Sequence, residues 1–414
     1  MFSNLKHKIF SSLLFVLFFL FLAFPVNAAE PKDYLEGKIL VQFKRNTQLS
    51  RINETLQRFN LRLSDRISQL DTLVLNVPKG AEEAFARSLS RNPLVEYAEP
   101  DYIAQAFWVP NDPYFFKQWG FNNTGQEILG VVGLLDADID APEAWELTLG
   151  GVKVAILDTG IDQNHEDLST QIVLNKDFTG SSTGYDDFYG HGTHVAGIVA
   201  AVTNNSIGAA GGCPHCQLIN GKVLDDTGSG AYSWIANGII WAADNGAKVI
   251  NLSLGGSSKS RTLENAINYA WNKGAVVVAA AGNSGNPSKT YPAAYSRVIA
   301  VAATNNKDQK SSFSNYGSLW VDVAAPGENI FSTFPNHPFV IQTKYGRSQD
   351  YDFASGTSMA APMTSGVVAL VWSTPYGTSN SSVRARLELT ADKIPGTGFY
   401  WSAGRINAGR AVSF

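Results

Sequence analysis

The sequence predicts a doubly wound, mainly parallel α/β domain that follows a smaller α+β domain. Two observations lead to this fold class. Beyond about residue 110, short uninterrupted apolar runs alternate with longer segments of helical pattern, as in parallel sheets whose strands are buried on both faces. Before that point, shorter strand-like and helix-like segments follow one another in the order β-α-β-β-α-β.

The larger domain contains five apolar runs with the length and composition of buried parallel strands. They occupy residues 152–158, 217–224, 248–254, 275–282 and 297–303. The helices expected between or after them span residues 191–203, 233–244, 261–272, 358–373 and 381–391. Functional groups of such sheets gather where parallel strands end, so the ends of these runs are the places to look for a site.

The smaller domain has the pattern of a ferredoxin-like unit. Its expected strands are Lys38–Phe43, a short strand near Leu61, Thr72–Val77 and Val95–Tyr97, and its expected helices are Leu49–Phe59 and Ala81–Leu89. Several prolines follow in a loop-like stretch that marks a domain boundary. We place this boundary between Phe107 and Trp108, so that the smaller domain spans residues 29–107 and the larger one 108–414.

Residues 1–28 are predicted to be a secretory signal peptide. Two lysines precede the apolar run Ile9–Phe24, and the small-residue pattern Val26-Asn27-Ala28 follows it. We expect cleavage after Ala28 and therefore a secreted, extracellular protein. A retained membrane anchor is the alternative, because the run is near the lower length limit for a span. No later stretch could cross a bilayer, so no stable membrane association is expected after cleavage.

Composition excludes nucleic acid as an expected partner. The 414 residues carry 32 Lys and Arg against 36 Asp and Glu, and no basic run occurs. Two cysteines cannot form a disulfide framework, so stability must come from the core, from bound metal or from both. Cys213 and Cys216 could close a small disulfide loop or remain thiols. They could also bind zinc with His215, or with His191 and His194.

Four polar side chains lie at predicted strand ends or helix starts. Asp158 ends an apolar strand, and Asn283 directly follows another. His191 and Ser358 each begin a predicted helix close to glycine residues. Taken alone, each has an ordinary interpretation as a turn residue, a helix start or an N-cap. Four of them at such places in one α/β domain are hard to explain separately.

These residue types together fit acyl transfer through a serine nucleophile. A carboxylate such as Asp158 can orient an imidazole, and the imidazole of His191 can accept a proton from a hydroxyl. The hydroxyl of Ser358 would then attack a carbonyl carbon. The amide of Asn283 can donate a hydrogen bond to the oxyanion that develops.

The motifs that contain these residues resemble those of the subtilisin-like serine proteases. In chain order they read DTG, HGTHVAG, AAAGN and GTSMAAP. The resemblance is closest to the thermitase-like branch of that family, and it extends from Pro110–Phe115 to Gly404–Ala408. It implies a serine endopeptidase that forms an acyl-enzyme.

Within this resemblance, Ser358 corresponds to the nucleophile, His191 to the general base and Asp158 to the carboxylate that orients it. Asn283 corresponds to the oxyanion donor that acts with the Ser358 backbone N–H, and His194 to a structural histidine. The smaller domain is similar to the family's inhibitory propeptide, which assists folding and is then removed by the enzyme itself. We expect a monomer whose partners are protein and peptide substrates and its own propeptide.

The resemblance also implies where a substrate binds. Two edge segments would hold an extended peptide as an added strand, and small residues would leave room for a large apolar or aromatic P1 side chain within an otherwise broad specificity. The edge segments are Gly228, Ser229 and Gly230 on one side and Ser253, Leu254 and Gly255 on the other; the S1 pocket is Gly256 with Ala280, Ala281 and Gly282; the S4 walls are Tyr232 and Ile235.

Calcium is the cofactor that the resemblance implies. The Gly/Asn-rich segment 202–209 interrupts the helix that begins at His191, and such a break frees carbonyl oxygens for a hard cation. The first site implied consists of Asp112, Asp177, Val202, Asn205, Ile207 and Ala209. A weaker cation site is implied at Ala293, Tyr295, Val298 and Asp322. The segment 181–189 offers only Asp186 and Asp187, too few for another site of this kind.

Three other interpretations compete. The repeated Asp-Thr-Gly at Asp226 invites an aspartic protease, but its flanking residues do not match those of Asp158. Gly180–Gly184 matches the nucleophile elbow of α/β-hydrolases, yet it lacks the strand before it and the helix after it. A catalytically silent binding protein with the same fold is the third alternative, and an assay of peptide hydrolysis distinguishes it.

Overall fold

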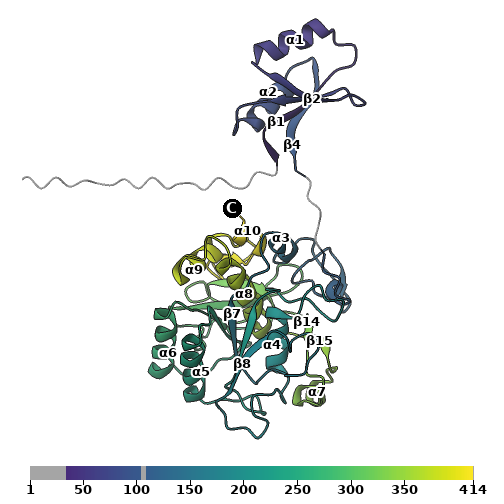
Figure 1. Cartoon of the computed structure of the whole chain (residues 1–414). Helices are drawn as coiled ribbons and strands as arrows, with labels where there is room; N and C mark the ends of the chain where they lie inside the picture. Colours follow the sequence, from purple (N-terminus) through teal and green to yellow (C-terminus); the bar gives the residue numbers. More distant parts are fainter. Residues whose placement is uncertain (1–33, 104–108, 414) are drawn as a thin grey trace, which may run out of the picture. The chain divides into compact units, whose positions relative to one another are not determined.

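The computed structural model describes residues 34–103 and 109–413, which form two compact units (Figure 1). The predicted signal peptide and the predicted boundary between Phe107 and Trp108 lie outside the described residues. Among the described residues, no helix has the length and apolar composition needed to cross a membrane.

The smaller unit has the expected β-α-β-β-α-β order of elements. These are β1 (Tyr34–Phe43), α1 (Leu49–Arg58), β2 (Arg62–Ile67), β3 (Thr72–Asn76), α2 (Glu82–Ser90) and β4 (Val95–Tyr102). They build an antiparallel sheet of order β2-β3-β1-β4. β4 extends beyond the predicted Tyr97, because it is an edge strand and tolerates Pro100, which lies opposite Ile39.

The larger unit is built on an eight-stranded parallel sheet of order β16-β13-β12-β11-β10-β7-β9-β8. Its strands are β7 (Lys153–Asp158), β8 (Ile172–Asp177), β9 (Gln217–Lys222), β10 (Val249–Leu252), β11 (Val276–Ala280), β12 (Val298–Thr304), β13 (Val323–Pro326) and β16 (Gly404–Arg405). Two pairs of antiparallel strands lie outside this sheet: β5 (Glu127–Ile128) with β6 (Val131–Val132), and β14 (Ile330–Thr333) with β15 (Tyr351–Ala354).

Helices cover both faces of this sheet, as the predicted doubly wound architecture requires. The longer ones are α4 (His191–Ala200), α5 (Tyr232–Asp244), α6 (Arg261–Asn272), α8 (Thr357–Trp372) and α9 (Asn380–Leu389). Shorter ones are η1 (Phe115–Lys117), α3 (Ala141–Trp145), α7 (Val340–Tyr345) and α10 (Ala408–Val412). Each of the five predicted helices is present, and the largest difference is that α4 ends at Ala200 rather than at residue 203.

Successive side chains along β7 point to opposite faces of the sheet, and each face packs against its own layer of helices. Val154 and Ile156 point into an apolar cluster with α4 and α8, whereas Ala155 and Leu157 point into a second cluster with α5 and α6. Figure 1 shows α5 and α6 side by side on one flank of the domain. Burial on both faces is the reason these strands read as uninterrupted apolar runs.

The strand order reverses beside β7, which pairs with β9 on one side and β10 on the other. In an open parallel sheet, the carboxyl ends of the strands at such a point leave a crevice for ligands. β7 ends at Asp158, so this carboxylate lies at the crevice.

Candidate active site

Asp158 and His191 form a hydrogen-bonded pair at this crevice. Asp158 is the last residue of β7 and only 1% exposed, and His191 is the first residue of α4. The His191 Nδ1 lies 2.7 Å from the Asp158 Oδ1. Since a carboxylate only accepts, Nδ1 carries the proton, and Nε2 is left with a lone pair that can accept another.

The environment of His191 favours its protonated form. Burial alone lowers the pKa of the ring, but the charge of Asp158 and its hydrogen bond, together with the charge of Asp187, outweigh burial. The result is a pKa above the ordinary value of 6.5. The imidazole is therefore a stronger base than a free histidine.

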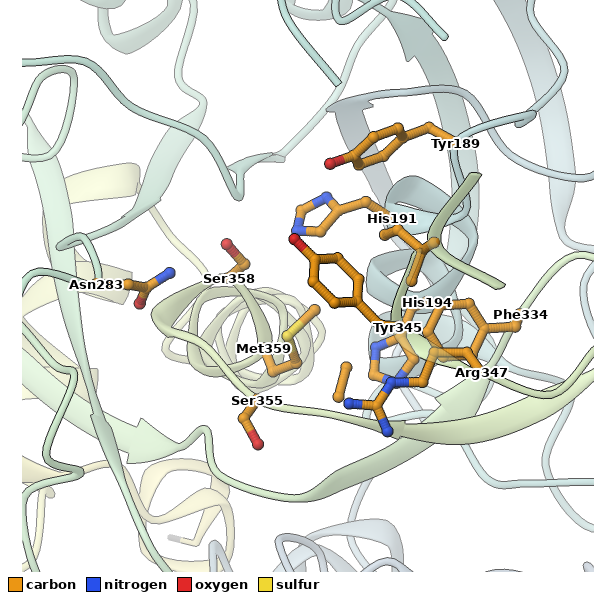
Figure 2. A pocket seen from close by; sticks show the side chains of 12 residues that line it. Tyr189, His191, His194, Asn283, Phe334, Tyr345, Arg347, Ser355, Ser358 and Met359 are labelled. Atoms are coloured by element: carbon orange, nitrogen blue, oxygen red, sulfur yellow. The ribbon is translucent and has the colours of Figure 1, made fainter. Parts of the chain in front are cut away.

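Ser358 is the second residue of α8 and shares a cavity of about 330 Å³ with His191 and Asn283. Figure 2 shows the Ser358 hydroxyl and the His191 ring facing the same open space. The Ser358 Oγ donates to the Ser253 carbonyl at 3.2 Å, and no hydrogen bond joins it to His191 among the described residues. Rotation about one side-chain bond would redirect the hydroxyl, and such bonds commonly tighten only when substrate is present.

Asn283 is held so that its NH2 group faces the serine. Its Oδ1 accepts hydrogen bonds from both the backbone N–H and the hydroxyl of Thr357, each at 2.9 Å. The carbonyl end of the amide is thereby fixed, and Figure 2 shows Nδ2 on the side of Ser358. An amide positioned in this way can donate to negative charge that forms next to the serine.

Asp187 fixes the backbone around His191, a role that the sequence did not reveal. This fully buried carboxylate accepts hydrogen bonds from the Thr159 hydroxyl, from the backbone of Tyr189 and Gly190, and from both the N–H and the hydroxyl of Thr193. It therefore joins the turn after β7 to the first turn of α4. The only sequence signal was an aspartate four residues before the histidine.

A second cavity of about 490 Å³ begins beside His191 and contains both predicted edge segments. It is lined by Gly228, Ser229, Gly230, Tyr232, Ile235, Ser253, Leu254, Gly255 and Gly256, all predicted from the sequence. Tyr189, which the sequence analysis missed, lines both cavities. Its ring packs so closely on Gly228 that a Cβ there would lie 2.5 Å from it.

The end of β11 carries the predicted S1 residues Ala280, Ala281 and Gly282. β11 pairs with β10, and Ser253 directly follows β10. The two alanines are at least 96% buried. Gly282 has a φ of +104°, and a Cβ on it would clash with the Asn315 amide, so only glycine fits at this turn. They do not line the second cavity, and their place in an S1 pocket stays a prediction.

Comparisons with known proteins identify the family. Residues 150–404 match the Subtilase family, and residues 23–101 match the Fervidolysin N-terminal prodomain. The chain belongs to the subtilase family. The predicted family, enzyme class and larger fold are thus confirmed: it is a subtilisin-like serine protease with an N-terminal prodomain.

Named relatives cover most of this subtilase. It is 43% identical over 397 residues to the thermophilic serine proteinase of Bacillus sp. (strain AK1), which covers 94% of this chain and 90% of the relative. It is 50% identical over 309 residues to thermitase of Thermoactinomyces vulgaris, covering 74% of this chain and all of thermitase. A solved protease structure from Pseudoalteromonas arctica PAMC 21717 superposes with a TM-score of 0.64 at 33% identity, over 74% of this chain and 99% of that one.

His194, considered as a zinc ligand, and Asp226, considered as part of an aspartic protease site, have other contacts in this subtilase. His194 is buried and contacts the Asp352 carbonyl, and burial lowers the pKa of its ring to about 3, so it is neutral. Asp226 accepts a hydrogen bond from the ammonium of the fully buried Lys222 at 2.6 Å and others from the Ser181 and Thr183 hydroxyls. It forms part of an ion pair, not of a carboxylate dyad.

The structure brings together only some of the residues of the first predicted calcium site. Asp112 accepts from the backbone of Asn204 and Asn205, as expected for a residue beside the 202–209 segment. Asp177 is not in these contacts, because its carboxylate caps its own turn through Thr179 and Gly180. The carboxylate that the structure places beside the 202–209 segment, together with Asp112, is Asp167.

Asp167 contacts the segment in three ways. Its carboxylate accepts from the Asn205 side chain at 2.7 Å and from the Ala209 N–H at 2.9 Å, and its carbonyl accepts from the Val202 N–H. Asp167 and Asp177 both follow Asp158 within one stretch of the chain, and only the path of the loop in the structure distinguishes them.

At the weaker predicted cation site, which stays a prediction, an arginine already supplies positive charge. Arg384 of α9 donates to the Asp322 carboxylate at 2.9 Å. The same guanidinium donates to the carbonyls of Ser296 and Val298. Ala293 and Tyr295 lie nearby in the chain, but the Asp322 carboxylate, the predicted ion ligand, is paired with Arg384.

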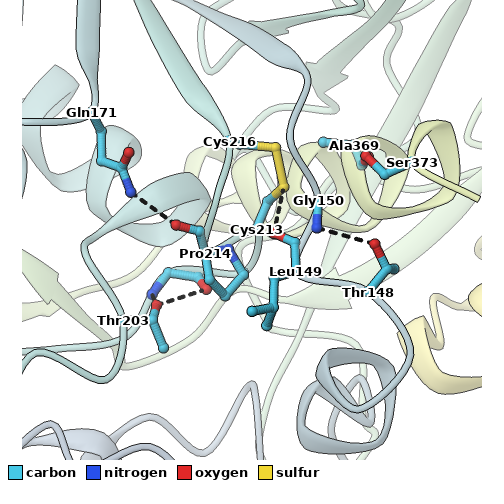
Figure 3. Close-up of a disulfide and its surroundings, with 12 residues drawn as sticks. Thr148, Leu149, Gly150, Gln171, Thr203, Cys213, Pro214, Cys216, Ala369 and Ser373 are labelled. Carbon is cyan, nitrogen blue, oxygen red and sulfur yellow. Dashed lines mark hydrogen bonds between the residues drawn. A yellow bond between two sulfur atoms is a disulfide. The ribbon is translucent and has the colours of Figure 1, made fainter.

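Cys213 and Cys216 form a disulfide (Figure 3). Both are fully buried beside Leu149 and Gly150, with α8 close by, whereas His215 between them is exposed. Because both sulfurs are used in the disulfide, neither is left as a zinc ligand.

Proposed function

We propose that this subtilase is a secreted endopeptidase that cleaves peptide bonds through Asp158, His191 and Ser358. The observation that carries this proposal is the Asp158–His191 hydrogen bond, whose free Nε2 shares one cavity with the Ser358 hydroxyl and the Asn283 amide. A silent binding protein would have no need for these four groups to converge.

The chemistry follows from the positions of these groups. The Ser358 Oγ attacks the scissile carbonyl while His191 Nε2 takes its proton, and Asp158 stabilises the imidazolium that forms. The oxyanion accepts hydrogen bonds from the Ser358 N–H and the Asn283 Nδ2. His191 then protonates the leaving amine, and water attacks the acyl-enzyme in the same way to release the acid.

The second cavity supports binding of an extended peptide between its two edges. A Cβ on Gly230 would lie 2.1 Å from the Val223 carbonyl, and one on Gly256 would lie 2.3 Å from the Tyr232 hydroxyl. Glycine at these places therefore lets the two edges pack closely against Val223 and Tyr232. We propose a preference for large apolar or aromatic P1 residues, with broad tolerance elsewhere.

We also propose that the protein is made as a precursor. Residues 1–28 would direct secretion, and residues 29–107 would act as an intramolecular inhibitor until the enzyme cuts between Phe107 and Trp108. The match of residues 23–101 to a prodomain supports a propeptide in this region, while the cuts after residues 28 and 107 stay predictions. An aromatic residue before the cut also agrees with the proposed P1 preference.

The pH profile of peptide hydrolysis tests the mechanism and the specificity together. Because the base must be neutral and the pKa of His191 is raised, we expect kcat/KM to fall towards low pH with a midpoint above 6.5. A substrate with Phe at P1 should be cleaved faster than matched substrates with Asp or Gly. A midpoint below 6.5 would contradict the base assignment, and faster cleavage after Asp would contradict the pocket.

Calcium fits the revised first site. Burial raises the pKa of Asp112, and it raises that of Asp167 to about 6, with the charge of Asp112 adding to the effect. Among the described residues, neither carboxylate is paired with a lysine or arginine, and no hydrogen-bond donor reaches the carbonyls of Val202, Ile207 and Ala209. Two uncompensated carboxylates beside free carbonyls form an oxygen-only set of the kind that calcium prefers. When bound, calcium would supply the missing positive charge.

Removal of calcium should lower the unfolding temperature. A ligand that binds only the folded state stabilises it by about 2.7 kcal/mol at a hundredfold excess over its Kd. We expect the melting midpoint of full-length Ser358→Ala protein, which cannot digest itself, to fall on adding a chelator. Asp167→Asn should abolish this response, and the matched variant Asp177→Asn should keep it. Coincident curves with calcium and chelator would refute the site.

A further inference from the structure

Three side chains from separate connections converge near the start of α4, outside the sites described above. Asp162 follows β7, Asp186 precedes α4, and His337 follows β14. One oxygen from each aspartate and one ring nitrogen from the histidine all lie within 4.8 Å of one another. None of the three has a role in the proposed hydrolysis or in the calcium site.

The ring of His337 presents a lone pair to this cluster. Its Nδ1 lies 3.1 Å from the Pro338 carbonyl, which can only accept, so Nδ1 carries a proton, and in the neutral ring Nε2 is the acceptor. The Nε2 is shielded from solvent and has no hydrogen-bond partner in the structure. The nearest carboxylate oxygen, Asp186 Oδ1, is 3.8 Å away, too far for a hydrogen bond.

The ring is also held in this orientation. It packs on Phe188 with ring centroids 4.5 Å apart, and its Nδ1 bond to a backbone carbonyl is the arrangement that usually fixes a metal-binding histidine. The lone pair of His337 Nε2 faces the Asp186 carboxylate, and no hydrogen bond joins them. A cation between them would satisfy both groups.

Asp162 provides a preorganised oxygen ligand. It is fully buried, and its two oxygens accept from the backbone N–H groups of Asn164 and Asn336 at 2.8 and 2.9 Å. Each carboxylate oxygen keeps a further lone pair. Within the part of the chain that the structure describes, no lysine or arginine pairs with the carboxylate of Asp162 or Asp186. The Lys222 ammonium donates to the Asp186 carbonyl, but its carboxylate partner is Asp226. The two carboxylates thus have no lysine or arginine ion-pair partner.

We propose that Asp162, Asp186 and His337 bind a divalent first-row transition metal ion such as Zn²⁺. With metal–ligand bonds of about 2.0 to 2.2 Å, two ligand atoms on one such ion lie about 3 to 4 Å apart, and the 3.8 Å between Nε2 and Oδ1 falls in this range. An imidazole with two carboxylates suits zinc and its neighbours, whereas calcium takes an oxygen-only shell. Water completes the coordination.

The ion would stabilise the loops that line the active-site cavity next to His191. The segment that carries His337 continues into Val340 and Ile341, whose N–H groups donate to the carbonyls of Phe188 and Tyr189. Tyr189 lines both cavities and lies two residues before His191. Metal binding would therefore join the connections after β7 and β14 to the one that leads into the catalytic helix.

Zn²⁺ titration of the full-length Ser358→Ala protein by calorimetry, in excess calcium, tests the proposal without relying on peptidase activity. We expect one equivalent to bind. His337→Ala and Asp186→Asn should each weaken binding by about tenfold or more. His215→Ala, which removes an exposed histidine from another loop, should leave the affinity unchanged. Because Asp186→Asn preserves shape, it remains informative if His337→Ala fails to fold, which a melting curve in chelator reports.

Three outcomes would overturn the proposal. The first is that no Zn²⁺ binds, which would leave His337 and Asp186 as a simple pair. The second is that affinity is unchanged in His337→Ala or in Asp186→Asn. The third is that binding is lost in His191→Ala but retained in His337→Ala, because the ion would then sit on the catalytic histidine.

Discussion

Replacing Ser358 by alanine should leave the precursor uncut and lower peptide hydrolysis by about six orders of magnitude, the cost of removing the nucleophile from enzymes of this kind. The hydroxyl is the only group in this arrangement that can form the acyl-enzyme. The fold should persist, because the Ser358 backbone position and its carbonyl bond to the Ser253 hydroxyl are unaffected by the change. Electrophoresis and N-terminal sequencing after expression in a protease-deficient host report the cut.

A serine remote from the cavity provides the control. Ser402 is exposed and donates to the Asp322 carbonyl, so Ser402→Ala should be processed and should hydrolyse peptides like the unmodified protein. Efficient processing of Ser358→Ala in that host would show that another protease makes the cut. Retained hydrolysis by purified Ser358→Ala would exclude this serine as the nucleophile.

Asn283→Leu should lower kcat by about 10²- to 10³-fold, or roughly 3 kcal/mol, while KM stays nearly constant. The amide acts on charge that exists only in the transition state, so its loss should not affect substrate binding. Leucine has a similar size but no donor. Steady-state kinetics with one chromogenic peptide separates the two parameters.

The fold needs a separate measurement in this variant, because Asn283 also accepts two hydrogen bonds from Thr357. A melting curve shows whether losing that acceptor destabilises α8. A large fall in kcat with an intact fold supports the oxyanion role. An unchanged kcat would mean that the oxyanion is stabilised elsewhere, and a rise in KM alone would assign Asn283 to substrate binding.

The sequence could predict the positions of the proposed catalytic residues because each lies where a local pattern ends. Asp158 closes an apolar strand, and His191 and Ser358 open helices whose starts the structure places at or within one residue of the predicted position. Parallel strands bring such ends to one edge of the sheet, so convergence followed from topology alone.

What the sequence could not predict depends on the paths of loops. Asp167 and Asp177 are equally plausible oxygen ligands in the chain, yet only Asp167 bonds to Asn205 and Ala209. Arg384 lies 62 residues beyond Asp322, and no sequence pattern between the two residues predicts their ion pair. Contacts between distant loops are set by packing, which hydrophobic periodicity does not encode.

The position of Asp187 illustrates the same limit within a short stretch. Its four partners range from Thr159 to Thr193, on both sides of the turn that presents His191. A single aspartate before a Gly-His motif gives no sign of this network. Buried polar groups of this kind become visible only when every donor around them is placed.

The central claim is that Ser358 is a nucleophile activated by His191, and covalent labelling tests it most directly. A fluorophosphonate reacts with an activated serine hydroxyl, and mass spectrometry of the digested protein locates the adduct. The account predicts one adduct per molecule, on Ser358, and almost none in His191→Ala. An adduct on a different serine, or equal labelling of Ser358 in His191→Ala, would contradict it.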